Sequence, residues 1–338
     1  MTGAAPRVLA VVALVLGLAL PGCGDETTIS HGGRVAGTTL TVYSLLPRTG
    51  PHARASADIV RGEKLALAQA GGRVGGLTVN YSALDEPVGP GGEVDPEKVA
   101  EAVREAVHDL SLIAVIGDLD SATARVSVPL LNAAGILHVS PGAGSTTFGQ
   151  PSDTPTLARL VPSDGAQAAA LATAARGRVA VEAEGSEAAQ ALASAVQARV
   201  GRTVDTARAD TVVYAGSDAV NARGVVEGIL EVNRRARVLL PQELWTTDLP
   251  AQLRGPRVRF ETTVSAQDPP GFDAAFARAF PGVAPGPLAK VGWGAMRAVL
   301  DAIRRAGPRA QSRQAVVEAF LTAHPPARVD AQPFRVAR

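Results

Sequence analysis

The segment Ser111–Pro141, SLIAVIGDLDSATARVSVPLLNAAGILHVSP, decides the fold of this 338-residue chain. It contains a continuous apolar run at residues 112–116 and a second predicted buried strand at 136–139, separated by a stretch with helical character at 121–135. Strands that are apolar throughout are typical of a sheet covered on both faces. A strand, a helix and a second strand in this order predict a parallel pair with a right-handed crossover. We expect the helix to be kinked or ended by Pro129.

The same alternation extends in both directions from this segment. The clearest helix is predicted over residues 95–110, where Asp95 can cap the N-terminus and Pro96 suits the first position. Further helices are predicted at 57–72, 186–201, 218–236, 270–281 and 286–307. Further strands are predicted at 38–47, 76–85, 177–183, 209–216, 237–244 and 257–266. The chain therefore contains two α/β units.

The last predicted helices have no strands of their own, so we expect them to return and cover the first unit. The fold class is then α/β, with two Rossmann-like lobes whose central sheets are parallel. The predicted first lobe comprises residues 39–158 and 266–322, and the second comprises 159–265 and 323–338. A chain that crosses more than once between lobes forms a hinge.

Composition argues against a nucleic-acid-binding protein. The formal net charge is only +1, and arginines are interspersed with acidic residues. Aromatic residues make up 4% of the chain, too few for a row of base-stacking platforms. Hydrophobic residues make up 46%, enough for large cores without disulfides.

The N-terminus has the pattern of a secretory signal, predicted at residues 1–22. Arg7 precedes an apolar run from Val8 to Leu20, which is shorter than the roughly 20 residues that span a bilayer. A buried core segment, or ordinary cleavage that leaves a free thiol, are the alternatives. Leu20-Pro21-Gly22-Cys23 resembles a bacterial lipobox, which implies cleavage before Cys23 and lipidation of its thiol. Residues 23–38 are small and polar, and we expect a flexible tether.

Several stretches together carry a family resemblance: YSLLPRTGP (43–51), DIVRGEKLALAQAGGRVGG (58–76), VIGDLDSATARVSVPLLNAAGILHVSPGA (115–143) and VGWGAMRAVLDAIRRAG (291–307). They resemble the substrate-binding lipoproteins of branched-chain amino acid ABC transporters, which are type I periplasmic binding proteins. The resemblance implies a small amino-acid-like ligand in the cleft between the lobes, closure by a hinge, and an ABC permease as partner. It also implies an extracytoplasmic location, with the lipid anchor in the cell membrane.

The predicted ligand site begins where the strand at 112–116 ends. A helix starts at Ser121, just after Asp120, and amide groups at a helix start favour a carboxylate. In the resemblance, Ser121 holds the ligand carboxylate; the alternative is that Ser121 only caps its helix. The loop after the next strand supplies Ala143, whose carbonyl the resemblance pairs with the ligand ammonium, and Gly144, which stands where the family has threonine.

Ser145 and Thr146 follow in the same loop and complete the first-lobe half of the predicted site. In the second lobe, Ser217 falls near a tyrosine of the family. Glu243, next to Gln242, is the candidate acid for the ammonium. The residues expected to bind the ligand carboxylate therefore match the family pattern, whereas those expected to bind the ligand ammonium differ from it.

No pattern of catalysis or metal binding is predicted. The five histidines are dispersed, Cys23 is the only cysteine, and no Gly-x-Ser-x-Gly elbow occurs. Asp118 and Asp120 form an acidic pair at a strand end, which we interpret as exposed loop acids because no second group converges on them. We therefore predict no enzyme, no cofactor and no metal.

Two functions remain open. The first is a membrane-tethered solute-binding protein that delivers an amino acid or an amide-like solute to an ABC permease. The second is a sensor or interaction lipoprotein with a vestigial cleft, which the altered second lobe favours.

Overall fold

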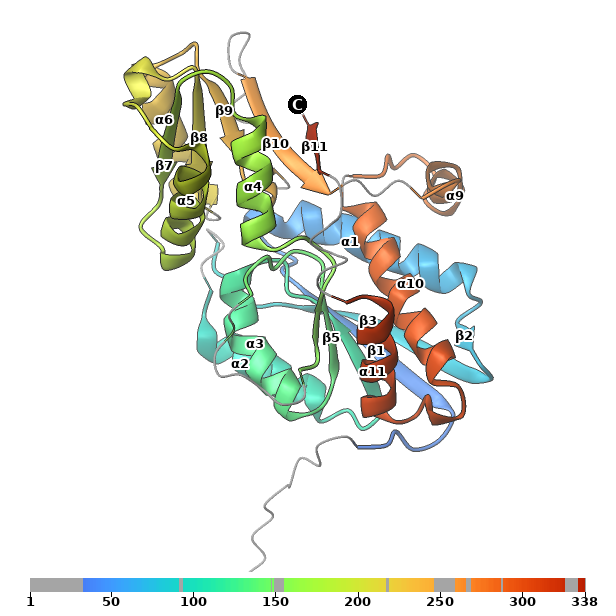
Figure 1. Cartoon of the computed structure of the whole chain (residues 1–338). Coiled ribbons are helices and arrows are strands. Elements are labelled where there is room, and N and C mark those ends of the chain that lie inside the picture. Colours follow the sequence, from blue (N-terminus) through green and yellow to red (C-terminus); the bar gives the residue numbers. More distant parts are fainter. Residues whose placement is uncertain are drawn as a thin grey trace, which may run out of the picture.

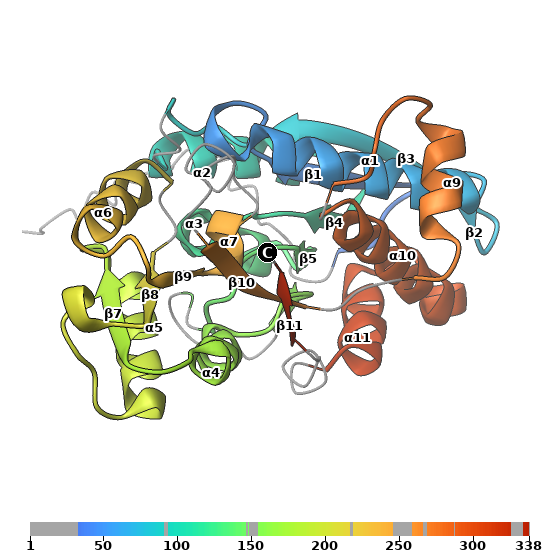
Figure 2. The same cartoon turned by 90° about the horizontal axis from the view of Figure 1, so that it is seen from above.

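The chain folds into two lobes, each built on its own β-sheet (Figures 1 and 2). The structure is a computed structural model that describes residues 33–90, 94–146, 148, 155–216, 219–245, 259–265, 269–286, 288–325 and 334–337. Cys23 and Ser217 lie outside these residues, as does the predicted signal sequence.

The sheet of lobe 1 has the strand order β2-β3-β1-β4-β5-β6. Its strands are β1 (Thr39–Leu46), β2 (Arg73–Val74), β3 (Leu77–Asp85), β4 (Leu112–Ile116), β5 (Leu137–Ser140) and β6 (Leu157–Arg159). All neighbours are parallel except β2, which pairs antiparallel with β3. The carboxyl ends of five strands therefore meet along one edge of this sheet.

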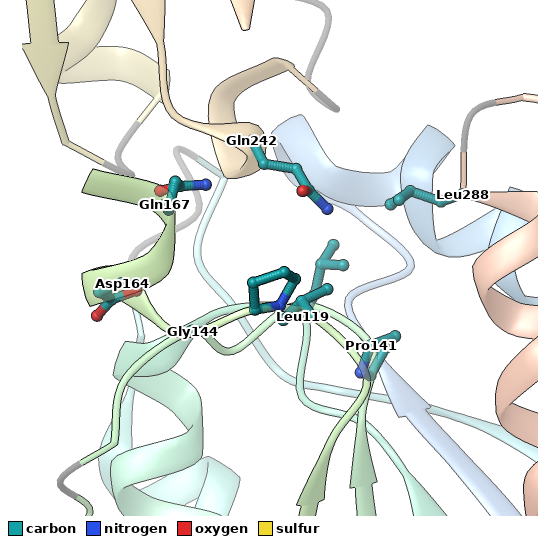
Figure 3. Close-up of a pocket in the computed structure, with 10 residues that line it drawn as sticks. Leu119, Pro141, Gly144, Asp164, Gln167, Gln242 and Leu288 are labelled. Carbon is teal, nitrogen blue, oxygen red and sulfur yellow. The ribbon is translucent and has the colours of Figure 1, made fainter. Parts of the chain in front are cut away.

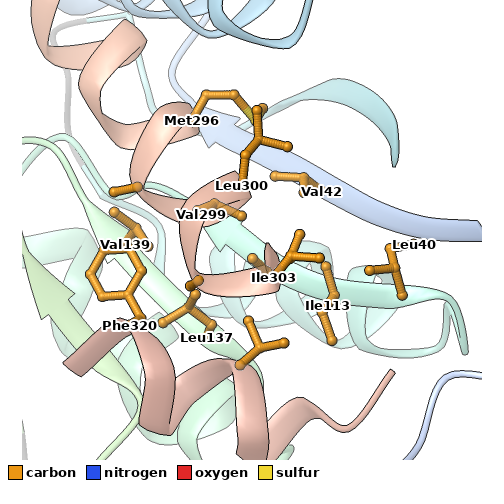
Figure 4. Packing of buried hydrophobic residues seen from close by; sticks show 14 of the residues in the cluster. Leu40, Val42, Ile113, Leu137, Val139, Met296, Val299, Leu300, Ile303 and Phe320 are labelled. Atoms are coloured by element: carbon orange, nitrogen blue, oxygen red, sulfur yellow. The ribbon is translucent and has the colours of Figure 1, made fainter. Parts of the chain in front are cut away.

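Helices cover both faces of the lobe 1 sheet, as the two apolar strand runs require. They are α1 (Ala53–Gln69), α2 (Pro96–Val107), α3 (Ser121–Ala133), α10 (Ala289–Ala306) and α11 (Arg313–Ala323), and α9 (Phe272–Ala279) packs outside them against α1 and α10. Helices α10 and α11 bury Met296, Val299, Ile303 and Phe320 against one face, as Figure 4 shows. Helices α2 and α3 pack on the other face.

Two glycines allow α1 and α10 to approach closely. A Cβ on Gly62 of α1 would lie 1.9 Å from the carbonyl oxygen of Ala289. A Cβ on Gly292 of α10 would lie 2.1 Å from the carbonyl oxygen of Ile59. Each glycine thus faces the backbone of the opposite helix, and no larger residue fits either position.

The sheet of lobe 2 has the order β11-β10-β9-β8-β7. Its strands are β7 (Val179–Ala183), β8 (Thr211–Ala215), β9 (Arg237–Leu240), β10 (Arg259–Ser265) and β11 (Phe334–Ala337), with only β11 antiparallel to its neighbour. Its helices are α4 (Asp164–Ala174), α5 (Glu187–Val200), α6 (Ala219–Val232) and the short α7 (Gln242–Trp245). Helices α4 and α5 bury one face of the sheet, and α6 buries the other.

The chain passes between the lobes after β6, after β10 and after α11. The predicted fold class, two α/β lobes with mainly parallel sheets and a hinge of several crossings, is confirmed. In the part of the chain that the structure describes, no helix has both the length and the apolar character needed to cross a bilayer.

Part of the predicted tether is folded. Arg34 forms a β-bridge with Ser312, and the amide of Val35 donates to the carbonyl of Gln311 at 2.8 Å. The side chain of Val35 is buried in the core of lobe 1. Residues 34 and 35 therefore belong to lobe 1, because an isolated valine among polar neighbours gains by burial where α11 begins.

Two local predictions have different outcomes. Asp95 caps α2, accepting from the amides of Glu97 and Lys98, which confirms the predicted start of that helix. Pro129 does not end α3, which continues through it to Ala133.

Candidate ligand-binding site

A pocket lies between the two lobes, at the carboxyl ends of the lobe 1 strands (Figure 3). Part of the pocket is open to solvent. Lobe 1 contributes Leu119, Pro141, Gly142, Gly144 and Leu288, whereas the first crossing and lobe 2 contribute Val161, Pro162, Asp164, Gln167 and Gln242. Ligands of open parallel sheets bind at this edge, which makes the pocket the candidate site.

Serine hydroxyls join the two lobe 1 loops that border the pocket. Ser140, at the end of β5, donates to the carbonyl of Asp118 at 2.8 Å and accepts from the amide of Ala143 at 2.9 Å. Ser121, the first residue of α3, accepts from the amide of Ser145 at 3.1 Å. The loop after β5 is therefore fixed to the turn after β4 at two points.

Asp120, rather than Ser121, caps α3. One oxygen of Asp120 accepts from the amides of Ala122 and Thr123, both at 2.8 Å. This corrects the alternative that Ser121 only caps its helix, because Asp120 stands one residue earlier, at the N-cap position. The amides of Ala122 and Thr123 are also occupied, whereas the hydroxyl of Ser121 can still donate to a ligand.

Asp118 and Asp120 are not exposed loop acids, as the sequence suggested, but are buried, with 1% and 9% of their surface exposed. They are covered because β3 and β5 bring buried side chains, Glu86 and His138, to the same edge of the sheet. Whether a turn after a strand is exposed or buried depends on the neighbouring strands. A local sequence pattern does not contain this information.

The other predicted residues have different places. Gly144 lines the pocket, Ala143 is buried just beside it, and Thr146 is exposed. Glu243 lies in α7, but its side chain is outside the described residues, and its neighbour Gln242 lines the pocket. Figure 3 shows Gln242 extending from α7 toward Leu119.

Asp164 is a pocket residue that the sequence analysis missed. It is the first residue of α4, and its amide donates to the carbonyl of Gly144 at 2.9 Å. Its Oδ1 lies only 2.3 Å from the place where a Cβ on residue 144 would stand, so glycine at 144 makes room for this carboxylate. Burial raises the pKa of Asp164, and the nearby charges of Arg159 and Arg125 partly lower it.

A signal for Asp164 exists in the sequence, because it follows a strand and begins a helix. The strand β6 has only three residues, too few for an alternating or continuous apolar pattern to predict it. Gln167 lies one turn further along α4 and also faces the pocket.

Comparison with known proteins defines the class. Residues 39–219 match the model of a periplasmic binding protein family, and the chain therefore belongs to that family. No curated protein sequence matches it.

The solved structures share the fold at low identity. A leucine-binding protein of Thermotoga maritima is 18% identical with a TM-score of 0.67, over 83% of this chain and 87% of that one. A branched-chain amino acid transporter substrate-binding protein of Streptococcus pneumoniae, in complex with isoleucine, is 14% identical with a TM-score of 0.69, over 84% and 88%. A solute-binding protein of an ABC transporter from R. palustris, in complex with benzoate, is 22% identical with a TM-score of 0.66, over 83% and 85%.

Proposed function

We propose that this protein is the solute-binding component of an ABC importer and that it captures a small amino-acid-like or amide-like solute between its lobes. The family and the two-lobed fold support this proposal. A solute that touches both lobes stabilises the closed form, because only that form offers both sets of contacts.

The observation that carries the ligand class is the carboxylate of Asp164. It lines the pocket beside Gly144, and no hydrogen bond reaches its oxygens from the described part of the chain. A ligand ammonium would supply the missing donor, and a charge-assisted bond of this kind is worth about 1.5–3 kcal/mol.

The carboxylate of an amino-acid-like ligand would have uncharged partners at this site. The hydroxyl of Ser121 and the amides of Gln167 and Gln242 are groups that can donate to a carboxylate or to an amide oxygen. The pocket lining within the described residues has no Lys or Arg, which would be the expected partner of a ligand that carries only a carboxylate. The apolar remainder, including Leu119 and Leu288, suits a short aliphatic side chain.

The test uses three related probes with the purified protein. L-Leucine has both charges, 4-methylpentanoate lacks the amine, and 3-methylbutylamine lacks the carboxylate; L-glutamine and the other common amino acids complete the panel. A hundredfold excess over the dissociation constant stabilises the native state by about 2.7 kcal/mol, which should raise the melting temperature by roughly 2–4 °C.

The variant Asp164→Asn should weaken binding of amine-containing probes about tenfold or more and leave 4-methylpentanoate unaffected. The matched control, Asp205→Asn, alters an exposed acid of lobe 2 that does not line the pocket and should change nothing. A folded protein that responds to no solute would contradict import and support the sensor or interaction lipoprotein instead.

Attachment to the membrane forms a separate part of the proposal. Lipidation of Cys23 would hold the lobes near the permease, on a tether that ends before Arg34. The variant Cys23→Ser should move the protein from the membrane fraction to the soluble fraction in the native host, and retention in the membrane fraction would contradict the anchor.

A further inference from the structure

Three carboxylates are buried together beneath the candidate site. Glu86 directly follows β3, whereas Asp118 and Asp120 follow β4, and none of the three is more than 9% exposed. Strand β1 lies between β3 and β4, and the amide of Glu86 donates to the carbonyl of Leu46 at its end. Because these strands are parallel, their carboxyl ends bring the acids to one edge of the sheet.

The three carboxylates differ in the hydrogen bonds that they accept. Asp120 accepts from two amides of α3, and Asp118 accepts from the hydroxyl of Ser127 and lies 3.3 Å from Nε2 of His138. Neither carboxylate oxygen of Glu86 has a hydrogen-bond partner among the described residues. An ionised carboxylate that is fully buried without a donor carries a large desolvation cost, which protonation removes.

We infer that Glu86 is a proton-binding site: its proton holds the 118–121 turn in place, and loss of that proton at alkaline pH displaces the turn, with Leu119 and Ser121, from the cleft. Ionisation would place a third negative charge beside Asp118 and Asp120, at the point where α3 begins. The inference goes beyond solute capture and does not depend on which solute the cleft binds.

The charges around Glu86 act in the same direction. Burial raises the pKa of Glu86 well above its ordinary value, and Asp118, Asp120 and the exposed Asp85 raise it further, whereas the hydroxyl of Thr123 lowers it in part. Two histidines interact with the aspartates: the charge of His52 acts on Asp120, and His138 lies 3.3 Å from Asp118. Neither is among the groups that shift the pKa of Glu86, so neither provides it with a direct counter-charge.

The cluster is not organised as a cation site. Within the described ranges, no three His, Cys, Asp or Glu side chains are arranged to share a metal ion. A proton needs only one oxygen, which Glu86 offers.

The first test is infrared spectroscopy of the full-length protein at neutral pH. A carboxylic acid has a C=O stretching band that a carboxylate lacks. Glu63, whose pKa is raised to about 7, would contribute to such a band at pH 7, so both proteins carry Glu63→Gln. In this background we expect a band at pH 7 that is lost when Glu86→Gln is added. No band at pH 7, or a band that is unchanged by Glu86→Gln, would overturn the inference.

The second test replaces the acidic neighbours of Glu86. Raising the pH should remove the band, and Asp118→Asn should lower the midpoint of this loss by about one pH unit, because a buried like charge raises the affinity for the proton. The matched control, Asp85→Asn, removes an exposed charge that water screens and should lower the midpoint less. Equal shifts in the two variants would contradict a coupled buried cluster.

The third test addresses the turn. In the wild type, hydrogen-exchange protection of the amides at 119–127 should fall about tenfold or more as the pH passes the midpoint. Glu86→Gln, measured at the same pH values, should keep its protection. Protection that changes equally in both proteins would show that the proton does not control the turn.

Discussion

Glu86 in lobe 1 and Glu184 in lobe 2 are both buried glutamates that directly follow a strand, β3 and β7 respectively. Glu184 accepts from the hydroxyl of Tyr214 at 3.1 Å and from that of Ser186 at 3.2 Å. Glu86 has no such donors in the described structure, and two aspartates lie beside it. A buried glutamate at the end of a strand is thus hydrogen-bonded to two hydroxyls in lobe 2, whereas in lobe 1 it lies beside two acids and is the proposed proton-binding site.

The two lobes also differ in the number of acidic residues buried in their interiors. In lobe 1 the buried acids are Asp58, Glu63, Glu86, Asp118 and Asp120, whereas Glu184 is the buried acid in the described part of lobe 2. The core of lobe 2 is built mainly of Ala, Val and Leu. We therefore expect the pH response to arise in lobe 1 and lobe 2 to act as a scaffold that presents Gln242 to the cleft.

The largest expected effect concerns helix packing in lobe 1. In Gly62→Ala the new methyl group would meet the backbone of α10, at Ala289 and Trp293, which cannot move aside as a side chain can. We expect a loss of about 3 kcal/mol or more in the free energy of unfolding, measured by urea denaturation.

The matched control is Gly224→Ala in α6 of lobe 2. Nothing lies within 4 Å of a Cβ at residue 224, and alanine favours a helix over glycine by about 1 kcal/mol. This variant should therefore be slightly more stable than the wild type. Similar destabilisation by both substitutions would show that close glycine packing does not distinguish the lobes.

The next effect tests the buried charge of lobe 1 through pH. Glu63 is fully buried and accepts from the hydroxyl of Tyr81 at 2.5 Å, and burial raises its pKa from 4.5 to about 7. The folded protein therefore binds this proton more tightly than the unfolded chain, so its stabilising contribution is present below pH 4.5 and is lost as the pH rises to about 7. The slope is about 1.4 kcal/mol per pH unit within that window.

The variant Glu63→Gln keeps the shape and an acceptor for Tyr81 but does not ionise. Urea denaturation at several pH values should show that the decrease between pH 4.5 and about 7 is smaller in this variant than in the wild type, by the contribution of Glu63. If wild type and variant lose stability in parallel over this range, Glu63 is not the group responsible.

A smaller effect compares two helix caps. Asp120→Ala removes the acceptor for the amides of Ala122 and Thr123 and should cost about 1–2 kcal/mol. Ser186→Ala removes the cap of α5, which accepts from the amide of Ala189, and should cost about 1 kcal/mol.

Solute binding should distinguish the two cap variants. Asp120→Ala should also weaken binding of any solute that raises the melting temperature of the wild type, because α3 borders the cleft, whereas Ser186→Ala should not. Equal binding by both variants would show that the start of α3 is structural only.

The sequence predicts the fold well because the fold depends on local patterns. The apolar runs that become β4 and β5, and the cap at Asp95, are each decided by a few neighbouring residues. The candidate site depends instead on distant segments. The burial of Asp118 requires His138 from another strand, and the role of Gly144 requires Asp164 from the far side of a crossing.

The smallest expected change in stability tests that last pair. In Gly144→Ala the new methyl group would stand 2.3 Å from Oδ1 of Asp164, which is the mobile end of a side chain and can rotate away. We expect the melting temperature to change little, while binding of amine-containing solutes weakens as much as in Asp164→Asn, because the carboxylate leaves its place in the pocket wall. The control Gly165→Ala adds a methyl group whose nearest neighbour is 3.8 Å away, and calorimetry should show unchanged affinity. If Gly144→Ala binds amines like the wild type while Asp164→Asn does not, the carboxylate works from a different position and the glycine does not set the chemistry of the pocket.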